Sequence, residues 1–364
     1  MKAFVTGGTG FIGQQVVRKL VERGYTVVAM ARSAHGIALV EAAGAQGVPG
    51  DIANVDAMRP AMAGSDVVFH IAGWYKVGAR DRQQAEKINV GGTRNVLNLA
   101  VELGVPRIVY TSTLAIYGDT HGQLVDESTP IPDGPFLSEY DRTKWQAHVQ
   151  VALPLIEQGA PIIIVLPGVV YGPGDHSLIG QVMRLYARGL PPVFPAPELG
   201  PTLAYLDDIA EGHLLAAERG RPGESYILAG PAVRGKAVLP IWAKALGRPV
   251  PRLSIPPQFL KPFAPLMAAL GRVVPLPELV SAEVINLLDA SYWGRAEKAR
   301  AELGWQPRPL EEGMRQTFAW IARQQQALSP RHTPGQLDRQ AAVRVALGLS
   351  IGLLLVWWWK RRRQ

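Results

Sequence analysis

The sequence predicts an α/β protein: a doubly wound parallel sheet, a smaller C-terminal lobe and a C-terminal membrane helix. Two observations predict the sheet and the lobe. Short apolar strands alternate with amphipathic helices through the first 170 residues, as in a parallel sheet covered by helices on both faces. The alternation then weakens, and prolines concentrate at 191–201 and 249–277. A third observation, an uncharged run at 345–359 followed by four basic residues, predicts the membrane helix.

The first half of the chain contains the strands of the sheet. Ala3–Thr6 is a short run of strand-forming residues, and after a glycine turn apolar side chains recur at helical spacing until Gly24. The same alternation continues to Leu166. We expect strands at 3–6, 26–30, 65–71, 107–111 and 162–166, with helices at 11–23, 83–103 and 138–158, the last disturbed at Pro154.

The second half of the chain is expected to form the smaller lobe, interleaved with the sheet. Helices are expected at 206–219, 281–289, 296–303 and 310–325. Residues 326–340 are polar and contain two prolines, so we expect a linker there. The predicted organisation is a sheet domain at 1–170, the lobe at 171–325, the linker at 326–340, the membrane helix at 341–359 and a basic tail at 360–364.

A glycine turn follows the first strand. In TGGTGFIG, Gly7 permits a tight turn, Gly10 lets the backbone approach a pyrophosphate, and Gly13 lets the next helix pack close to the sheet. Phe11 and Ile12 open that helix, whose N-terminal amides attract phosphate. The alternative is a plain tight turn, but the position between a first strand and an apolar helix favours a dinucleotide site.

The end of the second strand indicates which dinucleotide binds. An NAD site usually has an acid there to hold the ribose hydroxyls. This chain has Ala31 and Arg32 instead, and a guanidinium suits a 2′-phosphate, so we expect NADP, with NAD as the alternative. The alternative is that Arg32 is a solvated loop residue with no role in cofactor binding. Asp51, followed by Ile52, stands where an acid can accept a hydrogen bond from the adenine amino group, and its alternative role is to cap the next helix.

Tyr140 and Lys144 form a Y-x-x-x-K pattern in SEYDRTKWQAHVQ. On a helix this spacing puts both side chains on one face. There the ammonium group is expected to lower the pKa of the phenol, so that Tyr140 acts as a general acid or base. Upstream, YTSTLAIYG carries hydroxyls at Thr111, Ser112 and Thr113, at the carboxyl end of a strand, where ligands bind in such sheets.

The order of these motifs resembles that of the extended short-chain dehydrogenases/reductases, within the superfamily of NAD-dependent epimerases and dehydratases. The chain is most similar to the branch of dihydroflavonol-reductase-like and 3β-hydroxysteroid-dehydrogenase-like proteins. The resemblance covers about residues 2–325 and implies a Rossmann domain with a substrate-binding lobe. It rests on TGGTGFIG, HIAG, INVGGTRNV, YTSTLAIYG, YDRTK, LPGVVYGPGD and AYLDDIAEGHLLA.

The resemblance implies a role for each matching residue. Thr113 resembles the catalytic Ser/Thr, with Ser112 as the alternative, Tyr140 resembles the acid/base, and Lys144 resembles its partner. Asn89 resembles the asparagine of the long-helix motif or is a structural polar residue. The residues implied for the cofactor are Gly7, Gly10, Phe11, Ile12, Gly13, Arg32, Asp51, Ile52, Ala72, Gly73, Tyr140, Lys144, Pro167, Gly168 and Val169.

Three functions remain open. The first is an NADP(H)-dependent carbonyl reductase or alcohol dehydrogenase that acts on a lipophilic small molecule through this triad. The second is a nucleotide-sugar epimerase or dehydratase that retains NAD, for which Arg184, Arg188 and Arg295 would bind a diphosphate unless they are surface residues. The third is a non-catalytic dinucleotide-binding protein. The apolar segment 255–280 is either a buried helix or a lid over an apolar substrate.

Composition excludes other chemistries. With no cysteine, the chain forms no disulfides or cysteine-based metal sites, and we expect no metal. Residues 331–364 contain seven basic residues and one acid, +6 of the formal net charge of +8, so the excess belongs to the tail and we expect no nucleic-acid partner. Whether the protein forms a homodimer remains open. The N-terminus has no signal-peptide pattern, so the catalytic body is expected in the cytoplasm.

The C-terminal run is expected to anchor the protein in a membrane. As a helix, residues 345–359 span about 22 Å and residues 341–359 about 28 Å, close to the roughly 30 Å hydrocarbon core. Arg344 lies near the end of the longer span, where its side chain can snorkel. The tryptophans at 357–359 and the bases after them suit the headgroup region. A helix in the interface and a buried core helix are the alternatives.

Overall fold

The computed structural model describes residues 1–75, 82–189, 193–194, 197–250, 253–274 and 277–327. The chain divides into two compact units, Met1–Trp320 and Ile321–Gln364. In the second unit the structure describes only the end of helix α13 (Leu310–Ala327). The expected membrane helix at 341–359, the basic tail and almost all of the linker lie outside the described residues. No helix within the described ranges is long and apolar enough to cross a membrane.

A seven-stranded parallel sheet forms the centre of the first unit, as the alternation predicts. Its strand order is β11-β6-β5-β4-β1-β2-β3, so the chain starts in the middle, moves to one edge, and returns across β1 to build the other half. The reversal between β1 and β4 creates a crevice at the carboxyl ends of the strands. The strands are β1 (Lys2–Thr6), β2 (Thr26–Ala31), β3 (Gln46–Pro49), β4 (Val67–His70), β5 (Ile108–Thr111), β6 (Ile162–Pro167) and β11 (Ser225–Leu228).

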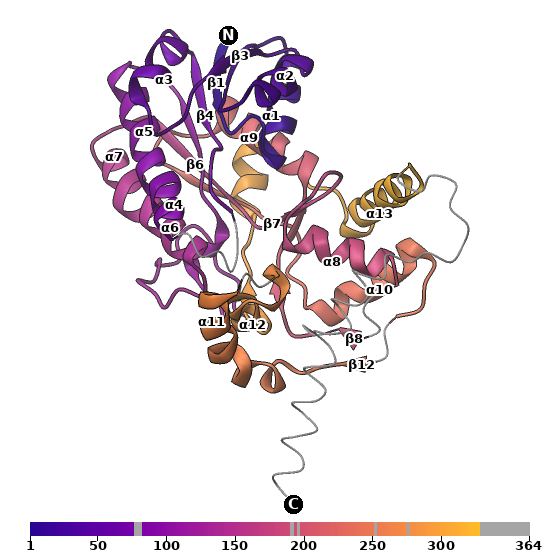
Figure 1. Ribbon diagram of the computed structural model, residues 1–364. Helices are drawn as coiled ribbons and strands as arrows, with labels where there is room; N and C mark the ends of the chain where they lie inside the picture. The colour runs from indigo at the N-terminus through magenta and orange to yellow at the C-terminus, as the bar shows by residue number, and fades with distance from the viewer. Residues whose placement is uncertain (76–81, 190–192, 195–196, 251–252, 275–276, 328–364) are drawn as a thin grey trace, which may run out of the picture. The chain divides into compact units, whose positions relative to one another are not determined.

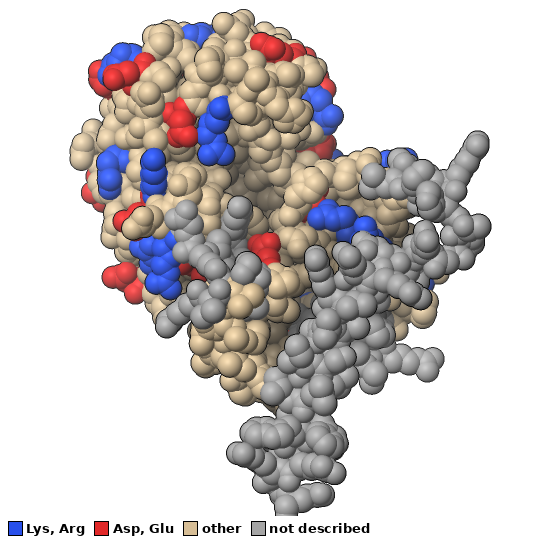
Figure 2. Space-filling view, in the orientation of Figure 1, with Lys and Arg blue, Asp and Glu red and all other residues tan. Residues whose placement is uncertain are grey.

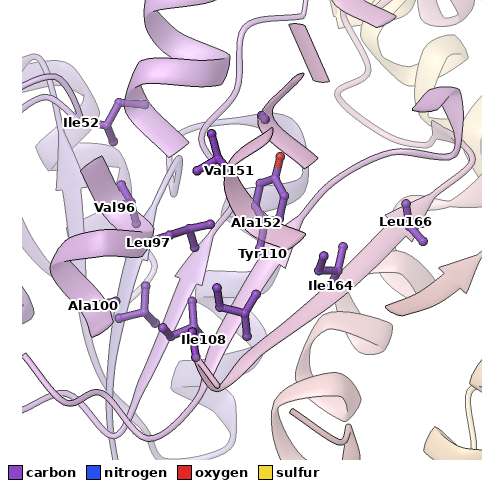
Figure 3. Packing of buried hydrophobic residues seen from close by; sticks show 14 of the residues in the cluster. Ile52, Val96, Leu97, Ala100, Ile108, Tyr110, Val151, Ala152, Ile164 and Leu166 are labelled. Atoms are coloured by element: carbon purple, nitrogen blue, oxygen red, sulfur yellow. The ribbon is translucent and has the colours of Figure 1, made fainter. Parts of the chain in front are cut away.

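Helices cover both faces of the sheet (Figure 1). Alternate residues of a strand point to opposite faces, so Phe4 packs in one apolar cluster while Ala3 and Val5 pack in the other. The first cluster lies under α3 (Val55–Met62), α5 (Thr93–Glu102) and the helices that follow β5, and Figure 3 shows part of it. The second lies under α1 (Phe11–Glu22), α2 (Ala34–Ala42) and α9 (Leu206–Arg219).

Two helices that were expected to be continuous are interrupted. The first contains α4 (Arg82–Glu86), the π-helical turn η1 (Lys87–Gly92) and α5. A Cβ at Gly92 would lie 2.3 Å from Ile52 Cδ1, so glycine allows the helix to approach the loop after β3. The second contains α6 (Glu139–Ala147), the π-helical turn η3 (His148–Ala152) and α7 (Leu153–Glu157). Pro154 lies in the first turn of α7, where its missing N–H is tolerated, so the disturbance precedes the proline.

The lobe after Tyr171 consists of short elements. Parallel two- and three-residue pairings join β7 (Val169–Tyr171) to β10 (Leu203–Tyr205), β8 (Val193–Phe194) to β12 (Leu253–Ser254), and β9 (Gly200–Pro201) to β13 (Ser291–Tyr292). Its main helices are α8 (Leu178–Ala187), α10 (Gly235–Leu246), α11 (Ala264–Val273) and α12 (Ala282–Leu287), and the helix expected at 296–303 ends in the π-helical turn η7 (Ala299–Leu303). The buried-helix interpretation of 255–280 is wrong, because Phe259, Leu266 and Leu270 are exposed.

Candidate active site

The carboxyl ends of β1, β4, β5 and β6 bring the predicted site residues to one edge of the sheet. Thr6, His70 and Thr111 are the last residues of their strands, and each is buried. Figure 2 shows a hollow near the centre of the face in view, close to where Figure 1 places β7. The loops that leave these strands carry the glycine turn, Ala72 and Gly73, and the Ser112–Thr113 pair.

The glycine turn has the geometry of a phosphate-binding loop. Gly7 has a φ of +77°, and a Cβ there would lie 2.5 Å from the backbone nitrogen of Ala72. A Cβ at Gly13 would lie 2.0 Å from the Gly7 carbonyl oxygen, so only glycine permits this close packing. Helix α1 begins at Phe11 after Gly10, with no side-chain cap and no acid in its first turn. Its first N–H groups are therefore left for an anion, and the loop fits a dinucleotide pyrophosphate.

Arg32 follows the end of β2 and is exposed. In the part of the chain that the structure describes, its guanidinium forms no hydrogen bond or ion pair, so it is available to a ligand. Asp51 does not cap α3, contrary to the alternative interpretation, because Asn54 accepts the capping hydrogen bond from the Ala57 N–H. The Asp51 carboxylate instead accepts from the Ala53 N–H at 2.9 Å, and Ile52 is buried.

Asn89 connects the loop after β4 to the helix of the Y-x-x-x-K pattern. Its Oδ1 accepts from the Trp74 N–H at 2.7 Å, and its Nδ2 donates to the Trp74 carbonyl and to Thr143 Oγ1. The side chain is fully buried, so these bonds fix the backbone next to Ala72 and Gly73. Asn89 thus has a structural role between the loop after β4 and helix α6.

The three hydroxyls at the end of β5 point to different partners. Thr111 Oγ1 is 2.9 Å from His213 Nε2, and Ser112 Oγ is 2.9 Å from His148 Nδ1. Thr113 Oγ1 accepts from the Ala115 N–H at 3.2 Å, and among the three hydroxyls it is the one that lowers the pKa of Tyr140. The geometry therefore favours Thr113 over Ser112 as the hydroxyl that faces a substrate.

Tyr140 and Lys144 lie one turn apart on α6, as the spacing predicts. Burial raises the pKa of Tyr140 to about 12, although the Thr113 hydrogen bond opposes this rise. Burial lowers the pKa of Lys144 to about 7. The shift of the Tyr140 pKa is opposite to the expected one, because desolvation penalises the phenolate and the ammonium alike. Lys144 Nζ donates to the Thr111 carbonyl at 2.7 Å.

The sequence analysis did not identify two residues that lie beside Tyr140. The Tyr75 ring packs edge to face on the Tyr140 ring, with centroids 4.8 Å apart. Asp141 is buried, and its Oδ2 accepts a hydrogen bond from Tyr292 of the lobe at 3.1 Å. Burial raises the pKa of Asp141 to about 6. Neither contact has a local signal in the sequence, since Asp141 and Tyr292 are 151 residues apart.

The segment Pro167–Val169 leads from the sheet into the lobe. Pro167 ends β6, and the Gly168 N–H donates to the Leu228 carbonyl of β11. A Cβ at Gly168 would lie 2.5 Å from the Thr202 carbonyl oxygen, so the segment packs closely against β10. Val169 is half-buried at this edge, where the resemblance places the loop over the nicotinamide.

The three arginines considered for a diphosphate do not form one site. Arg184 donates to the carbonyl oxygen of Asp175, while Arg188 and Arg295 are exposed. Arg295 lies near Asp126, away from α8. After desolvation, the charged groups that raise the pKa of Tyr75 are the acids Asp175, Glu278 and Asp141. Asp175 is 2% exposed, and its Oδ2 has no hydrogen-bond partner among the described residues.

Three histidines behind the site are buried and held neutral. His70 lies between Thr6 and Thr93, His148 contacts Ser112, and His213 contacts Thr111. Burial lowers the pKa of His70 and of His148 to about 3, and that of His213 to about 4. They orient hydroxyls at the strand ends and carry no positive charge at neutral pH. The described residues contain no cluster of three or more potential metal ligands.

The chain is similar to one known protein family and to several known proteins. The model of the NAD-dependent epimerase/dehydratase family matches residues 3–229. A ketoreductase of Stigmatella aurantiaca that is named for 4-hydroxy-2-methyl-3-oxo-4-farnesyl-3,4-dihydroquinoline-1-oxide is 33% identical over 309 residues, 84% of this chain and 92% of the relative. A 2-alkyl-3-oxoalkanoate reductase of Stenotrophomonas maltophilia is 31% identical over 345 residues, 88% of this chain and 99% of the relative. The crystal structure of gox2253 is 32% identical, with a TM-score of 0.77, over 88% of this chain and 98% of that one.

Proposed function

The chain belongs to the NAD-dependent epimerase/dehydratase family, and from this premise we propose that it is an NADP(H)-dependent carbonyl reductase for a lipophilic substrate. It is an enzyme of the short-chain dehydrogenase/reductase type, within which reductases and epimerases share one fold. The observation that carries the proposal is the state of Tyr140. A phenol with a pKa of about 12, beside the Thr113 hydroxyl that acts on it, is a proton donor at neutral pH.

The cofactor is held by residues of the first half of the sheet. Gly7, Gly10 and Gly13 with the first turn of α1 would hold the pyrophosphate, and Arg32 would pair with a 2′-phosphate. The loops at 51–52, 72–73 and 167–169 would line the rest of the molecule. When bound, the reduced nicotinamide supplies a hydride.

The chain's own residues supply the proton and fix the carbonyl. In this proposal Tyr140 donates its hydroxyl proton to the substrate oxygen as that oxygen gains negative charge, and Thr113 donates a hydrogen bond to the same oxygen. Lys144, with a pKa of about 7, stabilises the transient phenolate and helps to return its proton. Its hydrogen bond to the Thr111 carbonyl keeps the ammonium next to the site.

The charges around the site support a neutral, apolar substrate. The carboxylates of Asp141, Asp175 and Glu278 act electrostatically on Tyr75, and the same negative charges disfavour a nucleotide diphosphate there. Arg184, the candidate cation on α8, already binds the Asp175 carbonyl. Relatives with about one-third identity are named for substrates with farnesyl and alkyl chains, which agrees with this class. A nucleotide-sugar epimerase remains the second candidate because the family is named for NAD-dependent epimerases and dehydratases.

Two measurements on the purified enzyme test the proposal. We expect NADPH to bind and exchange freely, and kcat/KM for a series of 3-oxo compounds to rise with alkyl length. Tyr140→Phe is the control, because it removes the proton donor and keeps the ring packing on Tyr75. NAD that survives purification, together with turnover of a nucleotide sugar, would establish the epimerase instead. Binding of NADPH with no turnover of either class would leave a non-catalytic dinucleotide-binding protein.

A further inference from the structure

One side chain of the lobe reaches the helix that carries the proposed proton donor. Tyr292 lies on β13 and is half-buried, and its hydroxyl donates to Asp141 Oδ2 at 3.1 Å. Asp141 follows Tyr140 on α6 and is 4% exposed. A hydrogen bond to a buried carboxylate is stronger than one between neutral groups, so this bond is a firm contact between the lobe and α6.

The backbone of Tyr292 is connected to the segment that leaves β6. Its carbonyl accepts from Thr202 Oγ1 at 3.0 Å, and the Thr202 carbonyl accepts from the Val169 N–H at 2.8 Å. Thr202 is fully buried, and a Cβ at Gly168 would lie 2.5 Å from its carbonyl oxygen, so the two segments pack closely. Tyr292 thus joins α6, through its hydroxyl, to the segment 167–169, through its carbonyl.

The loop after β5 holds the strand that carries Tyr292. The Ser291 N–H donates to Asp119 Oδ1 at 2.9 Å, and the Ser291 carbonyl accepts from the Thr120 N–H at 2.8 Å. Ser291 is buried, and a network of satisfied buried hydrogen bonds makes the backbone rigid. Tyr292 therefore extends from a fixed strand, so its hydroxyl can hold α6 in one position.

We propose that Tyr292 and Asp141 are positioning residues, which set the position of Tyr140 relative to the segment 167–169. In the proposed reaction the nicotinamide hydride goes to the carbonyl carbon and the Tyr140 proton goes to the carbonyl oxygen, so both donors must face one group. A displacement of about 1 Å lowers the rate of such a step about a hundredfold. The inference rests on the proposed function, because it requires a nicotinamide beside the segment 167–169.

Two other roles of Asp141 must be separated from positioning. Its negative charge raises the pKa of Tyr140, so removing the charge would by itself change the rate. The bond to Tyr292 would also stabilise the fold without any effect on the site. The chain offers a matched control for this second role, because Tyr226 of β11 donates to Glu302 Oε2 of η7 at 2.9 Å. That bond is also between a tyrosine and a carboxylate, and neither residue belongs to the site described above.

The test uses four single variants of the full chain. Tyr292→Phe removes the hydroxyl, Asp141→Leu removes the acceptor, and Asp141→Asn removes the charge but keeps an acceptor oxygen for Tyr292. Tyr226→Phe is the control. The first readout is the fluorescence emission of bound NADPH, or of NADH if that cofactor binds more tightly, which reports how far the nicotinamide is shielded from water and needs no turnover. The second is kcat and KM for the reduction of ethyl 3-oxodecanoate.

We expect Tyr292→Phe and Asp141→Leu to shift the emission of the bound cofactor to the red. Cofactor Kd should change about threefold at most, because the glycine turn is intact. In both variants kcat should fall about tenfold to a hundredfold, and the double variant should be no slower than the slower single one, because one bond is lost. Asp141→Asn should keep kcat within about threefold of the wild type, since the bond remains. Tyr226→Phe should lower the Tm and leave emission and kcat unchanged.

Other outcomes overturn the proposal. Unchanged emission in Tyr292→Phe refutes it, and this variant decides alone if Asp141→Leu fails to fold. Equal losses in Asp141→Asn and Asp141→Leu assign the effect to charge, and an equal loss in Tyr226→Phe assigns it to stability. If the wild type binds the cofactor and reduces no 3-oxo compound while the emission still shifts, the proposed function fails and the positioning stands. A chain that binds neither cofactor overturns both.

Discussion

The neutral state of the three buried histidines predicts a loss of stability in mild acid. Their pKa values in the folded protein are about 3, 3 and 4, against about 6.5 in an unfolded chain. Between these values the unfolded chain binds more protons than the folded protein, so lowering the pH favours unfolding. Their contribution is therefore fully present above about pH 6.5 and is lost as the pH falls toward the folded pKa values.

The magnitude follows from these shifts. At pH 5 each buried histidine lowers the free energy of unfolding by about 2 kcal/mol, because the same histidine in the unfolded chain is protonated. The three together lower it by about 6 kcal/mol. Asp141 has the opposite effect, because its folded pKa of about 6 lies above the unfolded value. Its protonation between pH 7 and pH 5 raises the free energy of unfolding by about 1 kcal/mol. A net loss of about 5 kcal/mol is a large part of the 5–15 kcal/mol that typically stabilises a folded protein.

The assay compares the free energy of unfolding at pH 7 and pH 5 in the wild type and in His148→Gln. Glutamine keeps a hydrogen-bonding group beside Ser112 but has no proton to gain, so the loss should shrink by about 2 kcal/mol. His35→Gln, at an exposed position, is the control and should leave the loss unchanged. If wild type and His148→Gln lose the same free energy, His148 does not act as a buried neutral group and the reasoning is refuted.

Four further predictions concern the site and the anchor. Arg32→Glu should weaken NADPH binding roughly tenfold or more and leave NADH binding nearly unchanged, and equal affinities for both cofactors in the wild type would contradict NADP selectivity. Tyr140→Phe should lower kcat about 10²-fold to 10⁴-fold with cofactor binding retained, whereas Lys144→Ala should impair both; near-normal turnover in Tyr140→Phe would place the acid elsewhere. The rate of carbonyl reduction should fall as the pH rises through about 7, as Lys144 loses its proton, and a flat profile to pH 9 would exclude that role. The full chain should stay in the membrane fraction at high salt, while a chain ending at Gln326 should be recovered in the soluble fraction; equal behaviour of the two would show that the C-terminal run is no anchor.

The sequence predicted the features that depend on neighbours along the chain. The turn at Gly7, the close packing at Gly13 and the single helix face of Tyr140 and Lys144 follow from spacing, because backbone geometry alone relates residues three or four apart. The alternation of strands and helices likewise predicted the parallel sheet and its covered faces. It did not predict that β11 (Ser225–Leu228) completes the sheet from within the lobe.

Only the tertiary structure decided which side chains meet and what their environment does to them. The resemblance favoured Thr113 and left Ser112 as the alternative, and the structure separates them because His148, 36 residues from Ser112, binds the serine hydroxyl. The Tyr140 pKa moved opposite to the expectation because burial, which depends on the whole fold, disfavours the phenolate. The apolar segment 255–280 could be a core or a surface by composition alone. Hydrophobicity fixes how strongly such a segment avoids water, but only packing against distant residues decides whether the fold covers it.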